Sequence, residues 1–184
     1  MSDQPVVFAQ TFEGMFLRGL GAELSPALRS RLWELGLDLN QPLAPAYPVQ
    51  LWVAGLKLAA EHVYPSLPLE TAHRQLGERF VTGFTETLVG GAMMALLKVV
   101  GFKRALGRME RNFRSGNNFM RTRFVDHGPR DVEVVIESPY EIPAFTEGIF
   151  LAGARALRVQ GARVVSQPNP EGCSFRITWS DGAG

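Results

Sequence analysis

The stretch AFTEGIFLAGARALRVQ, residues 144–160, decides how the C-terminal third of the chain folds. Its apolar residues recur at helical spacing, first as Phe145, Ile149, Ala152 and Ala156 and then, widening the stripe, as Phe150, Leu151, Leu157 and Val159. Pro143 precedes the stretch and Gly161 follows it, as is typical of a helix start and stop. The stretch therefore predicts one amphipathic helix, in which Gly148 and Gly153 are points of close packing against another helix.

One pair of strands is predicted before this helix and a second pair after it. Residues 119–126 (FMRTRFVD) and 132–137 (VEVVIE) precede it, and both are rich in branched and aromatic residues. Residues 162–167 (ARVVSQ) and 174–179 (SFRITW) follow it, the last with apolar and polar residues in alternation. Together, the helix and the four strands predict a ββαββ unit in which the helix covers one face of an antiparallel sheet.

In the part of the chain before these strands, apolar residues recur at helical spacing. Apolar spacing and capping residues predict helices over 26–35, 49–64, 68–88 and 92–113. Residues 1–24 are ambiguous, with a possible short strand and then helical turns in which Phe12, Met15 and Phe16 face inward. We expect one α+β domain over residues 1–184, mainly helical in 1–114 and ββαββ in 115–180.

The composition is that of an ordinary globular protein, with 46% hydrophobic and 20% charged residues and a net charge of +1. A single cysteine, Cys173, suits a reducing compartment and excludes an internal disulfide. The N-terminus has no secretory signal pattern, so we expect a cytoplasmic protein. The longest uncharged apolar stretch, between Glu86 and Lys98, is too short to span a bilayer.

Charge is distributed unevenly. Residues 98–123 carry eight of the 19 Lys and Arg residues and a single acid, Glu110. Four arginines, Arg104, Arg108, Arg111 and Arg114, follow at near-helical spacing. They are either an anion-facing rim or a solvated helix face whose cations suit a helix C-terminus. The sequence disfavours nucleic acid as a partner, since the remainder of the chain is acidic and no aromatic residues alternate with the arginines.

No catalytic or metal-binding pattern is evident. His62, His73 and His127 lack metal-ligand spacing, and nucleotide-binding loops and serine-nucleophile motifs are absent from the sequence. Asp126 and His127 could pair as orienting acid and base, although a turn explains them more simply. Cys173 is most simply a small buried residue at a strand start. We therefore expect no metal and no cofactor.

Three segments carry a resemblance to a known family. The run NFRSGNNFMRTRF at 112–124, the pattern PxFxEG beginning at Pro143, and the FRITW strand at 175–179 resemble an uncharacterised paralogous family expanded in myxobacteria. More distantly, helices followed by ββαββ are similar to four-vinyl-reductase domains, Bet3-type transport-protein-particle subunits and haem–nitric-oxide-binding domains. This resemblance implies a ligand-binding fold with a hydrophobic cavity between helices and sheet.

The chain departs from these families at their functional residues. Haem–nitric-oxide-binding domains carry a tyrosine-x-serine-x-arginine motif, and the nearest match here, residues 64–68 (YPSLP), lacks the arginine. Four-vinyl-reductase domains tend to carry several cysteines near the C-terminus, and Cys173 stands alone. Because it belongs to the last strand, we transfer to it no acyl-carrying role of the Bet3 type. The resemblance thus implies a cavity but disfavours haem.

Our first hypothesis is a non-enzymatic domain that binds an apolar or amphiphilic small molecule or a protein partner and signals by association. The pocket wall would be formed by Phe80, Phe84, Leu88, Met93, Met94, Leu97, Phe145 and Ile149, and the rim by Arg104, Arg108, Arg111 and Arg114. The same wall residues could instead be plain core. A homodimer is expected on base rates.

Two other classes of function remain open. One is an enzyme acting on a small anionic substrate, which the arginines would bind while Asp126–His127 or Glu110 transfers a proton. The other is a basic surface that docks nucleic acid, with affinity that falls steeply with salt.

Overall fold

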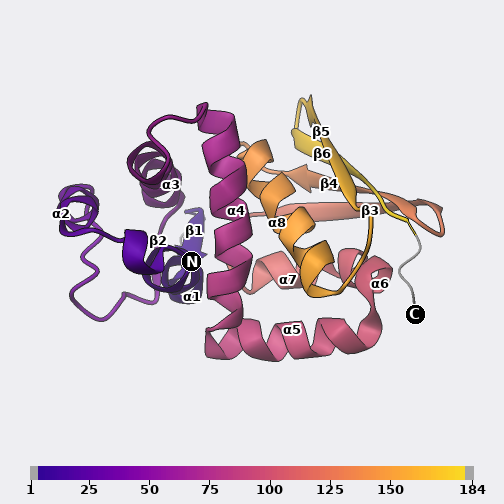
Figure 1. Ribbon diagram of the computed structural model, residues 1–184, viewed down its shortest axis with the longest axis horizontal. Helices are drawn as coiled ribbons and strands as arrows, with labels where there is room; N and C mark the ends of the chain where they lie inside the picture. The colour runs from indigo at the N-terminus through magenta and orange to yellow at the C-terminus, as the bar shows by residue number, and fades with distance from the viewer. Residues whose placement is uncertain (1–3, 181–184) are drawn as a thin grey trace.

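The C-terminal part forms a four-stranded antiparallel sheet with one helix across it. The computed structural model describes residues 4–180, except for the side chains of Glu110 and Asn112. The strands are β3 (Arg121–Gly128), β4 (Asp131–Glu137), β5 (Arg163–Asn169) and β6 (Gly172–Thr178), in the spatial order β3-β4-β6-β5. Helix α8 (Pro143–Ala156) covers one face of this sheet (Figure 1). The α+β class and the antiparallel ββαββ unit predicted from the sequence are confirmed.

The sheet face toward α8 is mainly apolar. Val134 lies opposite Phe124 on β3 and Phe175 on β6, so this register brings apolar side chains of three strands together. Phe175 is fully buried, and its ring lies 5.4 Å from that of Phe150 on α8. Cys173 is also buried on this face, as the sequence predicted.

Helix α8 is buried on its other side by α4 (Leu69–Thr85), which runs beside it in Figure 1. The two backbones meet at Gly77 of α4 and Gly148 of α8. A Cβ atom at Gly77 would lie 1.9 Å from the carbonyl oxygen of Phe145, and one at Gly148 would lie 2.1 Å from that of Arg74. The close packing predicted at Gly148 is confirmed, whereas Gly153 has no atom within 4 Å of its Cβ position, so that prediction is wrong.

The N-terminal elements form a second cluster on the far side of α4. They are β1 (Val6–Phe8), α1 (Ala9–Phe12), a π-helical segment (Glu13–Gly19), a 3-10 turn (Gly21–Glu23), α2 (Pro26–Glu34), β2 (Ala46–Pro48) and α3 (Val49–Val63). Strands β1 and β2 pair antiparallel. The Ser25 hydroxyl accepts from the Leu28 N–H and caps α2, as expected of a serine before a proline. Phe12, Met15 and Phe16 are fully buried, as predicted.

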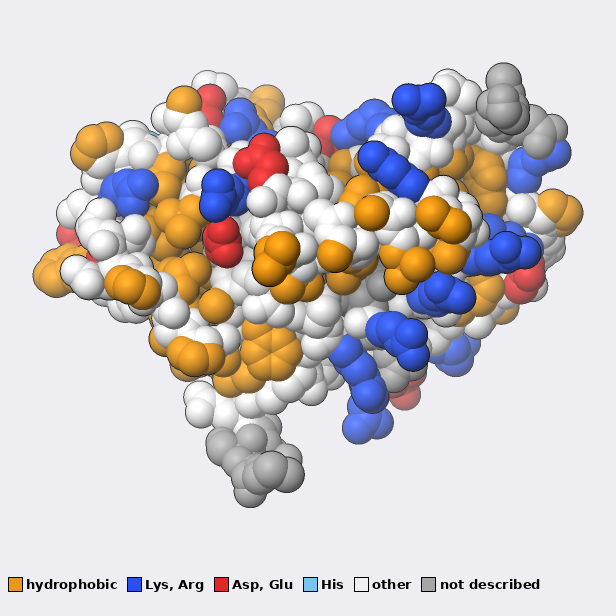
Figure 2. Space-filling model, turned by 90° about the horizontal axis from the view of Figure 1, so that it is seen from below, with side chains coloured by type: hydrophobic (Ala, Val, Ile, Leu, Met, Phe, Trp, Pro, Cys, Tyr) orange, Lys and Arg blue, Asp and Glu red, His pale blue; other side chains and the backbone are white. Residues whose placement is uncertain are grey.

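The single helix predicted over 92–113 is wrong. The segment forms α5 (Leu88–Val100), α6 (Phe102–Leu106) and α7 (Met109–Arg114). Gly101 has φ +81°, a conformation that ends a right-handed helix and favours glycine. Helix α4 ends at Thr85, and the chain bends by 96° between α4 and α5. Helix α5 then runs along the lower edge of Figure 1. The outer side of α5 therefore faces the viewer in Figure 2.

Among residues 4–180, no individual helix has the length and apolar composition needed to cross a bilayer. The α4–α5 pair would pass that test together, but only as a span sharply bent between the two helices.

Candidate functional site

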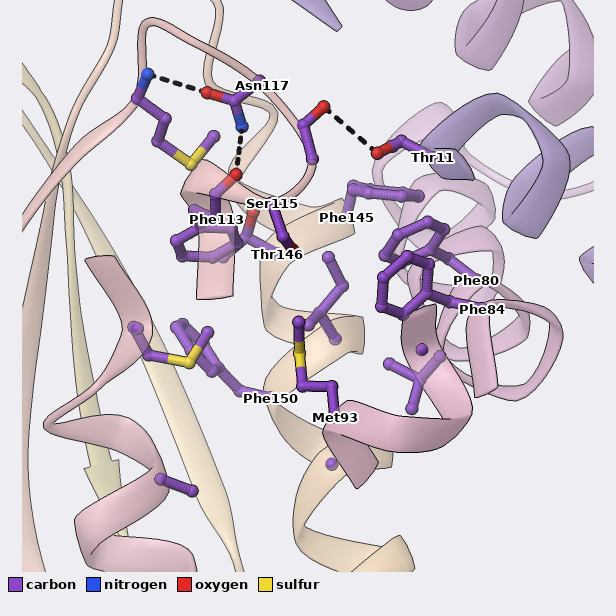
Figure 3. Close-up of a pocket in the computed structure, with 18 of the residues that line it drawn as sticks. Thr11, Phe80, Phe84, Met93, Phe113, Ser115, Asn117, Phe145, Thr146 and Phe150 are labelled. Atoms are coloured by element: carbon purple, nitrogen blue, oxygen red, sulfur yellow. Dashed lines mark hydrogen bonds between the residues drawn. The ribbon is translucent and has the colours of Figure 1, made fainter. Parts of the chain in front are cut away.

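A cavity of about 190 Å³ lies between α4, α5, α8 and the α6–α7 segment (Figure 3). Its wall is formed mainly by phenylalanine, methionine and aliphatic side chains. They include Val7, Trp52, Phe80, Phe84, Met93, Met94, Leu97, Leu106, Met109, Phe113, Met120, Phe145, Ile149 and Phe150. Cavities of about 150 Å³ with an apolar wall bind molecules the size of benzene, so this space is adequate for a small apolar ligand.

The structure brings most of the wall residues proposed from the sequence to one place. Phe80, Phe84, Met93, Met94, Leu97, Phe145 and Ile149 all line the cavity. Leu88 does not, because α5 begins just after the bend and places this side chain outward, 91% exposed. The rings of Phe80 and Phe145 lie 5.7 Å apart, and each also contacts Trp52, so this side of the wall is a rigid aromatic cluster.

The cavity has one polar end, which the sequence analysis missed. Tyr140, Glu141 and Thr146 line it at the start of α8, together with Ser115 and Asn117 of the loop before β3. The Asn117 side chain is held in place because its Oδ1 accepts from the Met120 N–H (2.8 Å) and its Nδ2 donates to the Phe113 carbonyl (3.2 Å). No periodicity marks Glu141 in the sequence; its only signal is an acid just ahead of Pro143.

Glu141 supplies the carboxyl group of this end. Its Oε1 accepts a hydrogen bond from the Thr146 hydroxyl. Burial raises the pKa of the Glu141 carboxyl from 4.5 to about 7, although hydrogen bonds from Thr146 and from the Ile142 backbone oppose this. An apolar cavity therefore carries, at one end, a carboxyl group that is both acid and base near neutral pH.

This pKa predicts a pH dependence of folding. Between pH 4.5 and 7 the folded state keeps the Glu141 proton while the unfolded state releases it, so the free energy of unfolding should fall as pH rises. At about 1.4 kcal/mol per pKa unit, the loss is up to about 3 kcal/mol. Glu141→Gln should lack this pH dependence. The free energy of unfolding of the variant, relative to that of the wild type, should therefore increase from pH 4.5 to pH 7. Urea unfolding across this range measures it; a difference that stays constant with pH would exclude a shifted Glu141.

The arginines proposed as a rim are not on one helix face. Arg104 lies on α6, Arg108 in the turn after it, and Arg111 and Arg114 on α7; all four are exposed. None of them lines the cavity. The break in the helix separates them, so the spacing read from the sequence does not apply.

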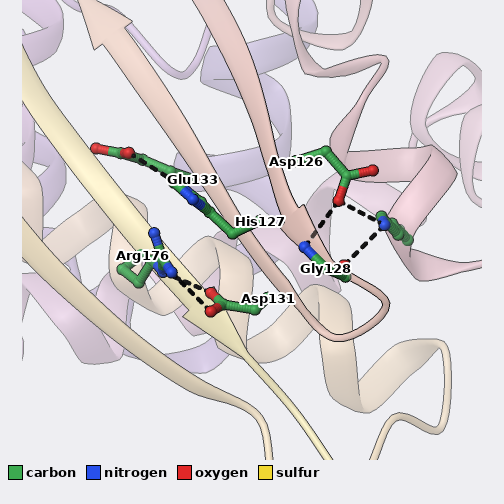
Figure 4. A network of polar contacts seen from close by, with 7 residues as sticks. Asp126, His127, Gly128, Asp131, Glu133 and Arg176 are labelled. Atoms are coloured by element: carbon green, nitrogen blue, oxygen red, sulfur yellow. Dashed lines mark hydrogen bonds and ion pairs between the residues drawn. The ribbon is translucent and has the colours of Figure 1, made fainter.

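Asp126 and His127 do not pair, which corrects the acid–base pair considered from the sequence (Figure 4). The Asp126 carboxylate accepts from the Lys103 ammonium (2.7 Å) and the Gly128 N–H (3.0 Å). The Lys103 hydrogen bond holds the pKa of Asp126 below its usual range. His127 instead faces Glu133, with Nε2 3.3 Å from Oε2. These contacts fix the hairpin between β3 and β4, and neither Asp126 nor His127 lines the cavity.

The other candidate ligating residues are dispersed. His62 Nε2 lies 2.8 Å from the Ser25 hydroxyl, and His73 is buried in α4; neither lines the cavity. Within residues 4–180 no three His, Cys, Asp or Glu side chains are grouped so that they could hold a metal ion.

An ion pair between α4 and α8, with a buried carboxylate, was also missed. Glu147 of α8 is 7% exposed; its Oε2 accepts from Arg74 Nε (2.8 Å) and from a terminal nitrogen (2.6 Å), and its Oε1 accepts from the Ser166 hydroxyl. The three residues join α4, α8 and β5. Glu147 falls inside an apolar helix pattern, and the sequence does not indicate which residue pairs with it.

The model of a protein family described as "Protein of unknown function (DUF2378)" matches residues 5–180. The chain belongs to this family. No curated protein sequence matches this DUF2378 chain.

Solved H-NOX structures share the fold. An Fe(II) unliganded H-NOX protein from K. algicida has a TM-score of 0.70 and 10% identity, covering 95% of this chain and 97% of its own. A triple mutant of an H-NOX protein from S. oneidensis in the Fe(II) ligation state has a TM-score of 0.72 and 10% identity, covering 95% and 97%. A third structure, described by haem redox potential and porphyrin distortion, has a TM-score of 0.64 and 12% identity, covering 95% and 96%. These identities show the fold alone, and the fold expected from haem–nitric-oxide-binding domains is confirmed.

The cavity of this DUF2378 chain does not fit haem. Haem iron is held by a histidine, cysteine or tyrosine, or by methionine with histidine. The described lining has neither histidine nor cysteine, and its tyrosine, Tyr140, packs its ring against Phe119 at 5.6 Å. It also has no arginine or lysine to pair with two propionates. A volume of about 190 Å³ is below the roughly 300–1,000 Å³ of pockets that hold drug-sized ligands.

Proposed function

We propose that this DUF2378 chain is a non-enzymatic cytoplasmic domain that holds a small apolar or amphiphilic molecule in the cavity and signals by association with a protein partner. The observation that carries the proposal is the cavity itself, which is mainly apolar and has a polar end around Glu141. The fold shared with H-NOX proteins supports a small-molecule site between helices and sheet. The protein partner and a homodimer stay predictions.

The two ends of the cavity favour an amphiphile. Methionines adapt their shape to an irregular apolar tail, and Met93, Met94 and Met109 all line the wall. A hydroxyl or amino head group would donate to the Glu141 carboxylate, which is otherwise held by Thr146. One such hydrogen bond in a buried site contributes about 1 kcal/mol, or more when an acceptor is charged.

We test the polar end with 1-octanol and nonane, which have the same number of non-hydrogen atoms. Isothermal titration should give octanol an affinity about fivefold higher than nonane, which corresponds to one hydrogen bond. Glu141→Leu should abolish this preference without abolishing binding. Equal affinities for the two probes in the wild-type protein would contradict a role for Glu141.

The apolar space is tested by filling it. Gly153 lines the cavity and has no atom within 4 Å of its Cβ position, so Gly153→Leu should place its side chain there without a clash. Octanol affinity should fall at least about tenfold, because the ligand and the new side chain compete for the same volume. Gly107→Leu is the matched control, since Gly107 is exposed between α6 and α7 and does not line the cavity. Unchanged affinity in Gly153→Leu would place octanol elsewhere.

A further inference from the structure

The outer face of α5 is apolar and exposed, although the helix lies at the surface. Leu88 is 91% exposed and Val99 83%. This α5 outer face consists of Leu88, Val89, Ala92, Ala95, Leu96 and Val99. A surface helix ordinarily presents polar residues to water on this side. A contiguous exposed apolar face of this kind marks an interaction surface.

Exposed cations lie near the end of α5 and in the segment α6–α7 that follows it. We call Lys98, Arg104, Arg108 and Arg111 the basic flank; all four are exposed. In the part of the chain that the structure describes, none of the four makes an ion pair with a carboxylate, whereas Lys103 is occupied by Asp126. Figure 2 shows a row of apolar side chains along α5 with basic side chains gathered around its C-terminal half.

We propose that the α5 outer face and the basic flank dock this protein onto the surface of an anionic lipid bilayer, with α5 lying in the interface. An apolar helix face bordered by Lys and Arg is the pattern of an interfacial helix, in which apolar side chains enter the acyl boundary and cations meet lipid phosphates. The acidic residues nearest to α5 in the sequence are Glu86 on its N-terminal side and Glu110 on its C-terminal side.

A second copy of the chain suits this face poorly. Pairing two α5 outer faces would bring two basic flanks together, and like charges at an interface oppose association. A bilayer instead supplies negative charge and an apolar layer side by side. Docking requires no spanning segment, because α4 stays inside the protein, where Leu76 is fully buried.

Vesicle sedimentation tests the charge. The wild-type chain should bind vesicles of phosphatidylglycerol and phosphatidylcholine (1:1) and should bind pure phosphatidylcholine at least about tenfold more weakly. Arg104→Glu, Arg108→Glu and Arg111→Glu combined should lower the partition coefficient for the mixed vesicles at least about 100-fold. The control is Arg31→Glu, Lys57→Glu and Arg163→Glu, which changes net charge equally on exposed positions elsewhere and should have little effect.

The apolar contribution is tested in the same assay. Leu88→Ser, Leu96→Ser and Val99→Ser combined should weaken binding at least about tenfold. These side chains are exposed, so folding is unaffected. The matched control replaces Trp33, Leu67 and Val165, which are exposed elsewhere, with serine.

A fluorescent label locates the contact. Val99→Cys carrying an environment-sensitive nitrobenzoxadiazole label should brighten and shift to the blue with anionic vesicles, and a label on Trp33→Cys should not. Cys173 will not compete for the label, because it is buried and desolvation raises the pKa of its thiol to about 11. Equal binding to neutral vesicles, an equal response at both labels, or a lipid-independent dimer lost with the serine triple would each overturn the proposal.

Discussion

Gly148→Ala should destabilise the protein by about 3 kcal/mol, a large effect for the addition of one methyl group. The new Cβ would lie 2.1 Å from the Arg74 carbonyl oxygen and 3.0 Å from the Glu78 nitrogen, both backbone atoms of α4. Backbone cannot rotate away as a side chain can, so the two helices must separate. Alanine normally stabilises a helix relative to glycine by about 1 kcal/mol, and here the clash outweighs that gain.

The matched control is Gly153→Ala in the same helix. Its Cβ would meet nothing within 4 Å, so helix propensity alone should act and stability should rise by about 0.5–1 kcal/mol. Urea unfolding of both variants measures the contrast. Similar shifts in the two variants would show that α4 and α8 do not pack backbone to backbone.

Arg74→Ala should cost about 3 kcal/mol, because it leaves the Glu147 carboxylate buried without its cation. Ser166 alone would then hold the carboxylate, and Glu70, the other partner of Arg74, is exposed and contributes little. Arg74→Met combined with Glu147→Leu should recover most of the loss, since replacing a buried pair with apolar residues is often neutral.

A surface pair provides the comparison for Arg74. Lys57 and Glu61 on α3 are exposed and 3.9 Å apart, so Lys57→Ala should change stability by less than about 0.5 kcal/mol. Thermal and urea unfolding of the three variants (Arg74→Ala, Arg74→Met with Glu147→Leu, and Lys57→Ala) measure these effects. If Arg74→Ala costs no more than Lys57→Ala, the Arg74–Glu147 contact does not join α4 to the sheet layer.

Local patterns were sufficient to predict the sheet and α8. Alternation of apolar and polar residues in β6 reflects one buried face, and Pro143 is a local signal for the start of α8. The predicted end at Gly161 is wrong, because α8 ends at Ala156 and Arg158 already has φ +58°. The break at Gly101 was missed because a glycine inside an apolar helical pattern does not reveal its φ angle. Helix α5 is apolar on two faces. The spacing of its apolar residues therefore could not indicate whether Leu88 faces the cavity or solvent.

The candidate site was predictable where it depends on helix faces and not where it depends on tertiary contacts. Phe80 and Phe84 share the α4 face that meets the cavity, which spacing alone indicates. Glu141 acquires its importance from burial, and Glu147 from burial and from partners distant in sequence, Arg74 and Ser166. Charge spacing misled for Arg104 and Arg111 because it assumed one continuous helix.

Native mass spectrometry of the protein purified from its own host tests the proposed cavity ligand most directly. We expect a non-covalent adduct with the mass of a small apolar or amphiphilic molecule, lost on denaturation and absent from Gly153→Leu purified in the same way. An apo mass for the folded wild-type protein, or an adduct retained equally by Gly153→Leu, would contradict a ligand held in this cavity.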